Sequence, residues 1–246
     1  MKSPLSKFLK KLVRLVKDMA KPLAYVFYAS YNRYHLGHSD TRKLPMTTIG
    51  EGAMIHPQAF VSERGVVIGN NCQVDACAII LERTILEDGA KVMGGSVIGT
   101  EGFVRLKVWK HITLRRFRGG VVISGRAVIG PHSCVDRAMT KGNTMVGNGS
   151  RVGSNVHIAH DVQIGRNCTI ETGAMLAGMM KINDGAVVGY DCSISNDLLI
   201  GEGAVVHPGA VVTKDVPANA AVSGNFAIHH LDHRRMMNEA GRSAGG

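Results

Sequence analysis

The densest group of residues able to perform chemistry is the stretch Asn155-Val156-His157-Ile158-Ala159-His160-Asp161. A histidine titrates near neutral pH, so it can accept a proton from a hydroxyl or an amine, and an adjacent carboxylate can orient its ring. His160 followed by Asp161 therefore predicts a general base. Composition alone favours a plainer interpretation, in which the two histidines are solvent-exposed members of the eleven in the chain.

A period of six residues surrounds this group and predicts the element that positions it. Every sixth residue of the following series is Val, Ile or Leu: Val146, Val152, Ile158, Ile164, Ile170, Leu176, Ile182, Val188, Ile194, Ile200, Val206 and Val212. An α-helix would scatter these side chains around its surface, since it has about 3.6 residues per turn. A chain that turns a corner every six residues would point them toward one axis, which predicts a β-helix solenoid. Ile158 then points inward, so His160 and Asp161 should lie on an outer surface or corner.

Further runs of the same period set the expected domain boundaries. Hexads begin near Ile49 and resume at Ile68 and Ile123 after interruptions, which predicts about eight coils over residues 48–217. Residues 100–120 break the period and contain the only Trp and six Lys or Arg residues, so we expect a loop that protrudes from the solenoid. Residues 218–246 form a C-terminal extension that is expected to contain a short helix.

Residues 1–47 are predicted to form a basic amphipathic helix followed by a linker. Ser3 can cap the helix with Pro4 in its first turn, and Pro22 ends or bends it. Residues 3–20 place apolar side chains on one side and Lys or Arg on the other, so this helix can lie on an anionic membrane surface. Packing on the solenoid or on a second subunit stays open, because an apolar stripe usually packs against protein.

Composition narrows the class of protein. The low aromatic content of 5% and the 30 Gly residues suit a narrow solenoid interior with tight corners. The formal net charge of +10 suits an acidic partner, but no nucleic-acid-binding module is recognisable. The five cysteines lack metal-ligand spacing and are predicted to be reduced and mostly structural in a cytosolic protein. No apolar run is long enough to span a membrane, and no signal peptide is expected.

The segment NVHIAHDVQIGRNCTI resembles the catalytic region of the hexapeptide acyltransferases of lipid A biosynthesis. These are the UDP-N-acetylglucosamine O-acyltransferases and the UDP-3-O-acylglucosamine N-acyltransferases. The resemblance implies an all-β, left-handed parallel β-helix that forms a homotrimer with active sites between subunits. It also implies that His160 is the general base. The segment GAMLAGMMKIND resembles the next coil of these enzymes, where the backbone N–H of Gly178 would hold the oxyanion.

The stretches VDRAMTKGNTMVGNG and IGTEGF, together with Trp109, resemble the N-acyltransferase more closely. They imply transfer of an acyl group to an amine of a sugar or sugar-nucleotide-like acceptor, in preference to a hydroxyl. The acceptor-binding candidates are Asp136, Arg137, Asn155 and His157.

The implied donor is an acyl-pantetheine thioester, carried by acyl carrier protein or CoA, with no bound cofactor and no metal. Acyl carrier protein is strongly acidic, which suits the positive charge of this chain. The basic candidates for contacting it are Arg105, Lys107, Lys110, Arg115, Arg116, Arg118, Arg234 and Arg235. Met179 and Met180 are expected to line an acyl groove, since flexible thioethers suit chain-like ligands, and Trp109 is a further donor contact.

The chain departs from the family pattern at defined positions. The N-acyltransferase has a uridine-binding N-terminal domain, which the basic helix and linker replace here. Met179 stands where the family has a His, and Gly153 stands where the N-acyltransferase has an acid. Asp161 is therefore expected to orient His160.

Other functions stay open on the sequence. The segment VTKDVPANAAVSGN also fits an acetyl-CoA-dependent hexapeptide acetyltransferase. A γ-type carbonic anhydrase-like zinc protein would use His157 and His160, with His132 as a possible third ligand. A non-catalytic scaffold is a further alternative. In each case a cytoplasmic protein is expected, with peripheral contact at the inner face of the membrane as a hypothesis for residues 3–20.

Overall fold

The computed structural model describes residues 43–102, 105–108, 111–114, 117–224 and 227–243. They fall into two units, which are described separately. The smaller one includes an antiparallel hairpin, β10 (Arg105–Val108) with β11 (His111–Leu114). The larger one contains the remaining strands and the C-terminal helix. The helix expected over residues 3–20 lies outside the described residues.

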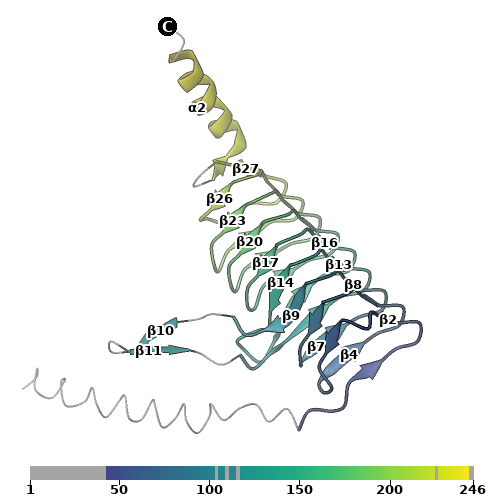
Figure 1. Cartoon of the computed structure of the whole chain (residues 1–246). Helices are drawn as coiled ribbons and strands as arrows, with labels where there is room; N and C mark the ends of the chain where they lie inside the picture. The colour runs from purple at the N-terminus through teal and green to yellow at the C-terminus, as the bar shows by residue number, and fades with distance from the viewer. Residues whose placement is uncertain (1–42, 103–104, 109–110, 115–116, 225–226, 244–246) are drawn as a thin grey trace, which may run out of the picture. The chain divides into compact units, whose positions relative to one another are not determined.

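The larger unit is a solenoid of three sheets, built from strands that are mostly two residues long (Figure 1). Sheet I contains β1 (Thr48–Ile49), β4 (Val66–Ile68), β7 (Thr84–Leu86), β12 (Gly120–Ile123), β15 (Asn143–Val146), β18 (Gln163–Ile164), β21 (Lys181–Ile182) and β24 (Leu199–Ile200). Sheet II contains β2 (Met54–Ile55), β5 (Gln73–Val74), β8 (Lys91–Val92), β13 (Val128–Ile129), β16 (Arg151–Val152), β19 (Thr169–Ile170), β22 (Val187–Val188), β25 (Val205–Val206), β27 (Ala221–Ser223) and β28 (Ile228–His229). Sheet III contains β3 (Phe60–Val61), β6 (Ile79–Ile80), β9 (Val97–Thr100), β14 (Cys134–Asp136), β17 (His157–Ile158), β20 (Met175–Leu176), β23 (Ser193–Ile194) and β26 (Val211–Val212).

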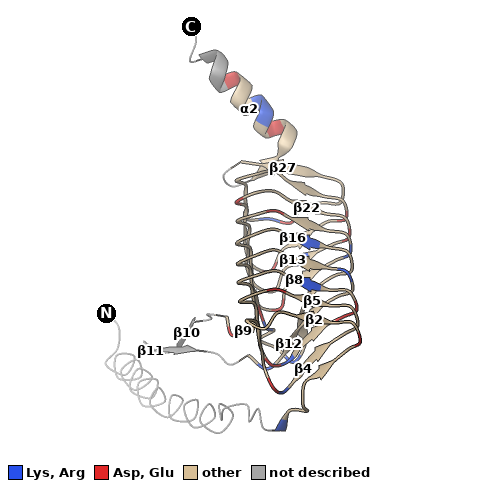
Figure 2. Ribbon diagram, turned by 45° about the vertical axis from the view of Figure 1, so that its right-hand side comes forward, with Lys and Arg blue, Asp and Glu red and all other residues tan. Residues whose placement is uncertain are grey.

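The pairing register confirms the period predicted from the sequence. Ile158 aligns with Leu176 and Leu176 with Ile194, so each residue pairs with the one three hexads later. All strand pairs within the three sheets are parallel except β27 with β28. Three parallel sheets of short strands are typical of the left-handed β-helix. Figure 2 shows the stacked coils, with basic residues marking β8 and β16.

The core contains the predicted row of apolar side chains and a second row that the pattern did not predict. All twelve residues of the series from Val146 to Val212 are at most 3% exposed. The second row lies two positions before them and is equally buried: Val156, Val162, Cys168, Ala174, Met180, Ala186, Cys192, Ala204 and Ala210. Its small side chains fit beside the larger ones in a narrow interior. Cys72, Cys168 and Cys192 are thus buried, and none of the described cysteines forms a disulfide.

The chain turns a corner every six residues, and the backbone at one residue of each corner is left-handed. Positive φ angles recur at Asn155, Asp161, Asn167, Gly173, Met179, Gly185, Asp191, Asp197, Gly203 and Gly209. Gly, Asn and Asp tolerate this conformation, whereas it is strained for other residues. Met179 is therefore the exception in this row, with φ of 63° and a side chain that is 46% exposed.

We expect Met179→Gly to raise the free energy of unfolding by about 0.5–1 kcal/mol, because glycine removes the strain of the left-handed corner. Met175 is the matched control, since it is equally exposed at 50% but lies in the extended strand β20. Met175→Gly should lower stability, as glycine weakens a strand interior. Denaturant unfolding measures the free energy of unfolding of both variants. An equal decrease in the two variants would show that the strain at the Met179 corner is not significant.

The C-terminal extension ends in the predicted helix, α2 (His230–Ser243). It follows β28, and the ring of His230 at its start stacks on that of His207 with centroids 4.2 Å apart. The helices found among the described residues are neither long nor apolar enough to cross a membrane.

Candidate active site

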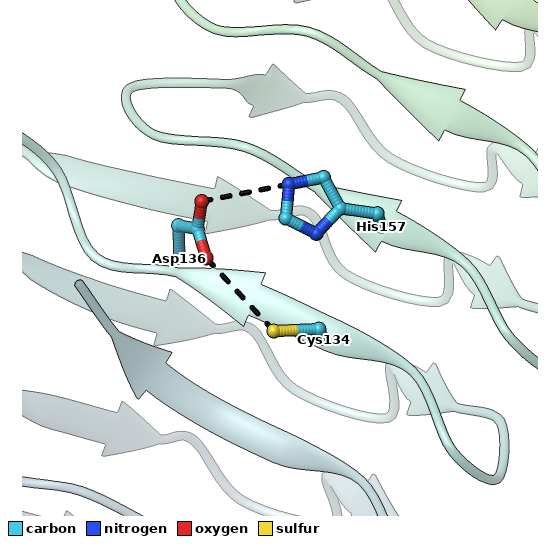
Figure 3. Close-up of side chains that lie close together, drawn as sticks. All are labelled: Cys134, Asp136 and His157. Carbon is cyan, nitrogen blue, oxygen red and sulfur yellow. Dashed lines mark hydrogen bonds and ion pairs between the residues drawn. The ribbon is translucent and has the colours of Figure 1, made fainter. Parts of the chain in front are cut away.

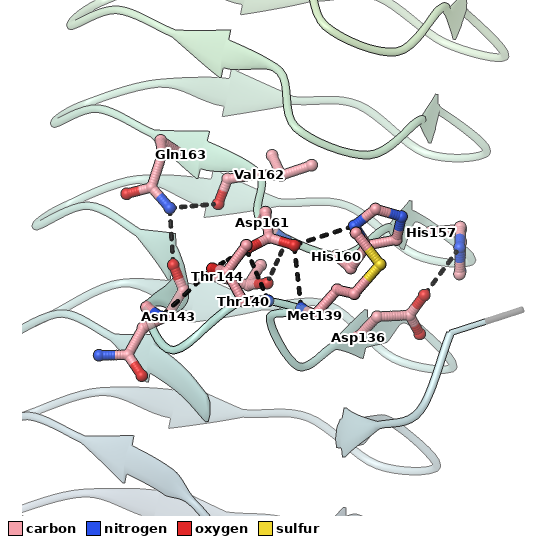
Figure 4. Close-up of polar contacts among 11 residues, drawn as sticks. Asp136, Met139, Thr140, Asn143, Thr144, His157, His160, Asp161, Val162 and Gln163 are labelled. Atoms are coloured by element: carbon pink, nitrogen blue, oxygen red, sulfur yellow. Dashed lines mark hydrogen bonds and ion pairs between the residues drawn. The ribbon is translucent and has the colours of Figure 1, made fainter. Parts of the chain in front are cut away.

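His160 and Asp161 lie at the corner between β17 and β18, with side chains that are 12% and 13% exposed. Nδ1 of His160 lies 3.0 Å from Oδ2 of Asp161 (Figure 4). Because a carboxylate only accepts hydrogen bonds, this contact places the proton of a neutral ring on Nδ1. Nε2 is then left with a lone pair that can accept a proton. The ring is thus oriented by its neighbour in the chain.

The segment before β15 fixes Asp161 in place. The backbone N–H of Met139 donates to Oδ2 at 2.9 Å, and the hydroxyl and N–H of Thr140 donate to Oδ1 at 2.5 and 3.3 Å. The N–H of Asp161 in turn donates to Oγ1 of Thr144 at 2.9 Å. Burial acts to raise the pKa of the Asp161 carboxyl, but the hydrogen bonds from Thr140, His160 and Met139 hold that pKa below its ordinary value. Asp161 is therefore a carboxylate at neutral pH.

This lowered pKa predicts a loss of stability in acid. The carboxylate of Asp161 contributes stability that is complete above the unfolded-state pKa of about 3.9 and is lost as pH falls through the lower native pKa. Asp161→Asn keeps a residue that tolerates the left-handed corner. We expect wild type to be more stable than this variant at pH 7, and the difference to shrink below about pH 4. Thermal unfolding of wild type and Asp161→Asn over a range of pH measures this difference in stability. A difference that does not change with pH would contradict a stabilising role for the ionised carboxylate.

Two further residues confine the ring of His160. Phe117 is 4% exposed and meets the imidazole edge-on, with centroids 5.6 Å apart and an interplanar angle of 71°. Gly178 lies one coil further on, and a Cβ placed there would come within 2.6 Å of Cε1 and 2.7 Å of Nε2 of His160. Only glycine therefore leaves room for the ring. No hydrogen bond in the described structure is donated by the Gly178 N–H, so this group is available next to the imidazole.

The acceptor-binding candidates Asp136 and His157 also lie side by side (Figure 4). Nε2 of His157 is 3.5 Å from Oδ2 of Asp136, whose side chain is 4% exposed. The hydroxyl of Thr100 donates to Oδ1 of Asp136 at 2.8 Å. Cys134 precedes Asp136 on β14 and is directly aligned with His157 on β17. Burial, with the charge of Asp136, raises the pKa of the Cys134 thiol.

Arg137 and Asn155 have structural roles that the sequence did not reveal. The guanidinium of Arg137 is 6% exposed and forms ion pairs with Glu82, at 2.8 Å, and with Glu101. Arg137 therefore joins two carboxylates of its own chain rather than presenting a free guanidinium to an acceptor. Asn155 occupies an exposed corner with φ of 54°, which explains its residue type; its contact with an acceptor stays a prediction.

Among the donor-binding candidates, Met180 was predicted wrongly. It is 0% exposed because it belongs to the second row of the core, so it does not line a surface groove. Met179 is half exposed at its corner, one residue after Gly178. Arg234 and Arg235 are exposed on α2, where Arg235 lies 3.5 Å from Asp232. Trp109 lies outside the described residues.

A shallow pocket of about 490 Å³ extends along sheet III from His157. Its floor follows the ladder of aligned outward residues Met175, Ser193 and Val211. Most of the lining is aliphatic, which suits an apolar chain-like ligand. The pocket therefore connects the histidine-containing coil to an apolar strip over the following coils.

Comparisons with known proteins agree with this fold. Residues 143–178 match the family described as bacterial transferase hexapeptide (six repeats). UDP-3-O-acylglucosamine N-acyltransferase 1 of Gloeobacter violaceus is 47% identical over 154 residues, which are 62% of this chain and 44% of the relative. The UDP-3-O-acylglucosamine N-acyltransferase of Caulobacter vibrioides strain NA1000 is 34% identical over 107 residues, or 44% of this chain and 31% of the relative. The chain thus spans less than half the length of these curated relatives.

Solved structures give the same picture. A UDP-N-acetylglucosamine acyltransferase from Campylobacter jejuni superposes with a TM-score of 0.66 at 27% identity, covering 77% of this chain and 73% of that one. The corresponding acyltransferase from Bacteroides fragilis gives a TM-score of 0.67 at 26% identity, with 78% and 74% covered. The solenoid is therefore shared with both.

Proposed function

We propose that this hexapeptide-repeat protein, a relative of the N- and O-acyltransferases of lipid A biosynthesis, transfers an acyl group from a pantetheine thioester to an amine of a sugar or sugar-nucleotide-like acceptor. The observation that carries the proposal is the setting of His160. Asp161 fixes its tautomer, Phe117 and Gly178 confine its ring, and the Gly178 N–H is available beside it.

The proposed reaction uses these groups in sequence. Nε2 of His160 takes a proton from the acceptor amine as its nitrogen attacks the thioester carbonyl carbon. The Gly178 N–H donates to the oxygen of the tetrahedral intermediate, whose negative charge develops as the C–N bond forms. Collapse breaks the C–S bond, and the proton held by His160 passes to the leaving sulfur. The products are an amide and a free thiol, so no external reactant is needed.

The nature of the acceptor is inferred from relatives and from the polar contacts near His160. The 47% identical relative is named an N-acyltransferase of an acylglucosamine nucleotide, which favours an amine over a hydroxyl. Asp136 and His157 are adjacent and lie on strands next to the His160 corner. A carboxylate and an imidazole at this place suit the hydroxyl and amine groups of a sugar.

The donor side of the proposal rests on the apolar pocket and on charge. The strip from His157 along Met175 and Val211 suits an acyl chain. The net charge of +10 favours an acidic carrier protein over a neutral partner. We further infer a cytoplasmic homotrimer with peripheral membrane contact through residues 3–20; light scattering for mass and vesicle flotation test these two points.

Thiol release from three donors tests the function. Acetyl-CoA, a long-chain acyl-CoA and a long-chain acyl carrier protein would each be offered with amino sugars, free and nucleotide-linked. We expect turnover with the long-chain carrier protein and a nucleotide-linked amino sugar. Preference for acetyl-CoA would assign the chain to the small-group acetyltransferases. No thiol release with any pair would contradict acyl transfer to amino sugars.

A further inference from the structure

We propose that Cys134, Asp136 and His157 bind a divalent transition-metal ion of the zinc type on the outer face of sheet III. Their potential ligand atoms all lie within 4.8 Å of one another (Figure 3). Among the described residues, no other group of three or more His, Cys, Asp or Glu side chains meets that condition. The site shares Asp136 and His157 with the proposed acceptor contacts, but its metal binding can be measured without any acyl transfer.

The solenoid brings the three residues together. Cys134 and Asp136 are two apart on β14, so both side chains face outward while Val135 is buried in the core. The ladder aligns Cys134 with His157 on the next coil. The register of β14 against β9 shifts between Val135 and Asp136, which is a local irregularity that re-aims a side chain. The ligands are therefore held on rigid strands rather than on loops.

Their separations suit one small cation. Nε2 of His157 lies 3.5 Å from Oδ2 of Asp136, and Sγ of Cys134 lies 3.9 Å from Oδ1. Metal–ligand bonds of about 2.0–2.3 Å in tetrahedral geometry place neighbouring ligand atoms about 3.3–3.8 Å apart. The two distances run to different oxygens of the Asp136 carboxylate, and small side-chain rotations would bring Nε2, Sγ and one of these oxygens into the coordination shell of one ion.

The chemistry of the set favours zinc over magnesium or calcium. Thiolate and imidazole are ligands of transition metals, whereas magnesium and calcium prefer oxygen alone. A thiolate and a carboxylate together cancel the charge of a divalent ion, which lowers the cost of holding it in a partly buried place. Three protein ligands leave a fourth position for water or a polar ligand atom. The side chain of His157 is 36% exposed, so a metal ion can reach the three ligands from solvent on that side.

A second layer supports the ligands. The hydroxyl of Thr100 donates to Oδ1 of Asp136 at 2.8 Å and lies 3.9 Å from Sγ of Cys134. Such an outer contact fixes the orientation of a ligating carboxylate and commonly contributes about 10–100-fold to metal affinity. Asp136 is a deeply buried carboxylate, and a cation would balance its charge in addition to the contacts from Thr100 and His157.

Titration of the chelator-treated full chain with Co²⁺ tests the site. We expect a thiolate-to-cobalt absorption band together with the visible bands of tetrahedral Co²⁺, and loss of both when zinc is added. Cys134→Ser should abolish the thiolate band, and His157→Gln should weaken binding and alter the visible bands. Cys77→Ser is the matched control, because Cys77 is exposed and free elsewhere on the solenoid. It should titrate like wild type.

Two further variants make the result decisive. Thr100→Val should weaken cobalt binding by about 10–100-fold while the band shape is kept. His160→Ala should bind cobalt like wild type even though it is expected to be inactive, so failure of the metal site and failure of the proposed catalysis are distinguishable. A thiolate band that survives in Cys134→Ser, or cobalt binding that needs His160 but not His157, would overturn the proposal. Melting curves in chelator establish that each variant folds.

Discussion

We expect His160→Ala to remain folded and to lose turnover by about 10²–10⁴-fold, the usual contribution of a general base. The imidazole contacts the Asp161 carboxylate and lies next to Gly178, where the oxyanion donor is proposed. Folding should survive because Asp161 keeps its hydrogen bonds to Met139 and Thr140. The core residue Ile158 is also unaffected. Steady-state thiol release with the best donor and acceptor pair measures the loss.

His132→Asn is a suitable control for this variant. His132 is exposed at another left-handed corner of the solenoid, with φ of 57°, and asparagine tolerates that conformation. The control should keep turnover within about twofold of wild type, since surface substitutions away from special features change little. Full turnover in His160→Ala would show that this histidine is not the base. A large loss of turnover in His132→Asn would instead favour the zinc-protein alternative, in which His132 is a metal ligand.

Gly178→Ala is expected to lower turnover by about 10²–10⁴-fold, although it removes no catalytic group. The added methyl would stand 2.6–2.7 Å from Cε1 and Nε2 of His160. Phe117 and Asp161 also contact the ring, so we expect the methyl to displace it and to weaken its hydrogen bond to Asp161. The backbone N–H at 178 is kept, so the loss reports displacement of the base rather than loss of the oxyanion donor.

The double variant separates these effects. In the His160→Ala background there is no ring to displace, so adding Gly178→Ala should cost little further turnover. Additive losses would show that the methyl acts in some other way, for example by blocking the substrate. Gly125→Ala is the matched structural control, because its methyl would meet the side-chain nitrogen of Asn148 at 3.0 Å and the backbone oxygen of Asp88 at 3.2 Å, but no atom of His160. It should leave turnover close to that of wild type.

The fold was predictable in outline because the constraint on the sequence is local and repeats. Each coil must bury an aliphatic side chain at the same place, and each corner needs a residue that tolerates positive φ. Ile158, Leu176 and Ile194 therefore revealed both the period and the inward direction. The second buried row was missed since Ala, Cys and Met occupy it beside Val, and small or mixed residues give a weak apolar signal.

The site was only partly predictable because its residues come from different coils. His160, Asp161 and Gly178 were recognised from short motifs. Phe117 was missed, since it follows an interruption that carries no period and its contact with His160 spans two coils. Thr140 was also missed, because it hydrogen-bonds Asp161 from 21 residues earlier in the chain and no local motif links the two.

By itself, the sequence determined the period, the inward and outward faces and the position of one histidine next to one carboxylate, because all of these follow from neighbours along the chain. Only the tertiary structure decided that Met180 is core, that Arg137 joins Glu82 to Glu101, and that Cys134 meets His157. The physical reason is the stacking of coils. Stacking brings residues about eighteen positions or more apart into contact. A local sequence pattern does not indicate which of these side chains will touch.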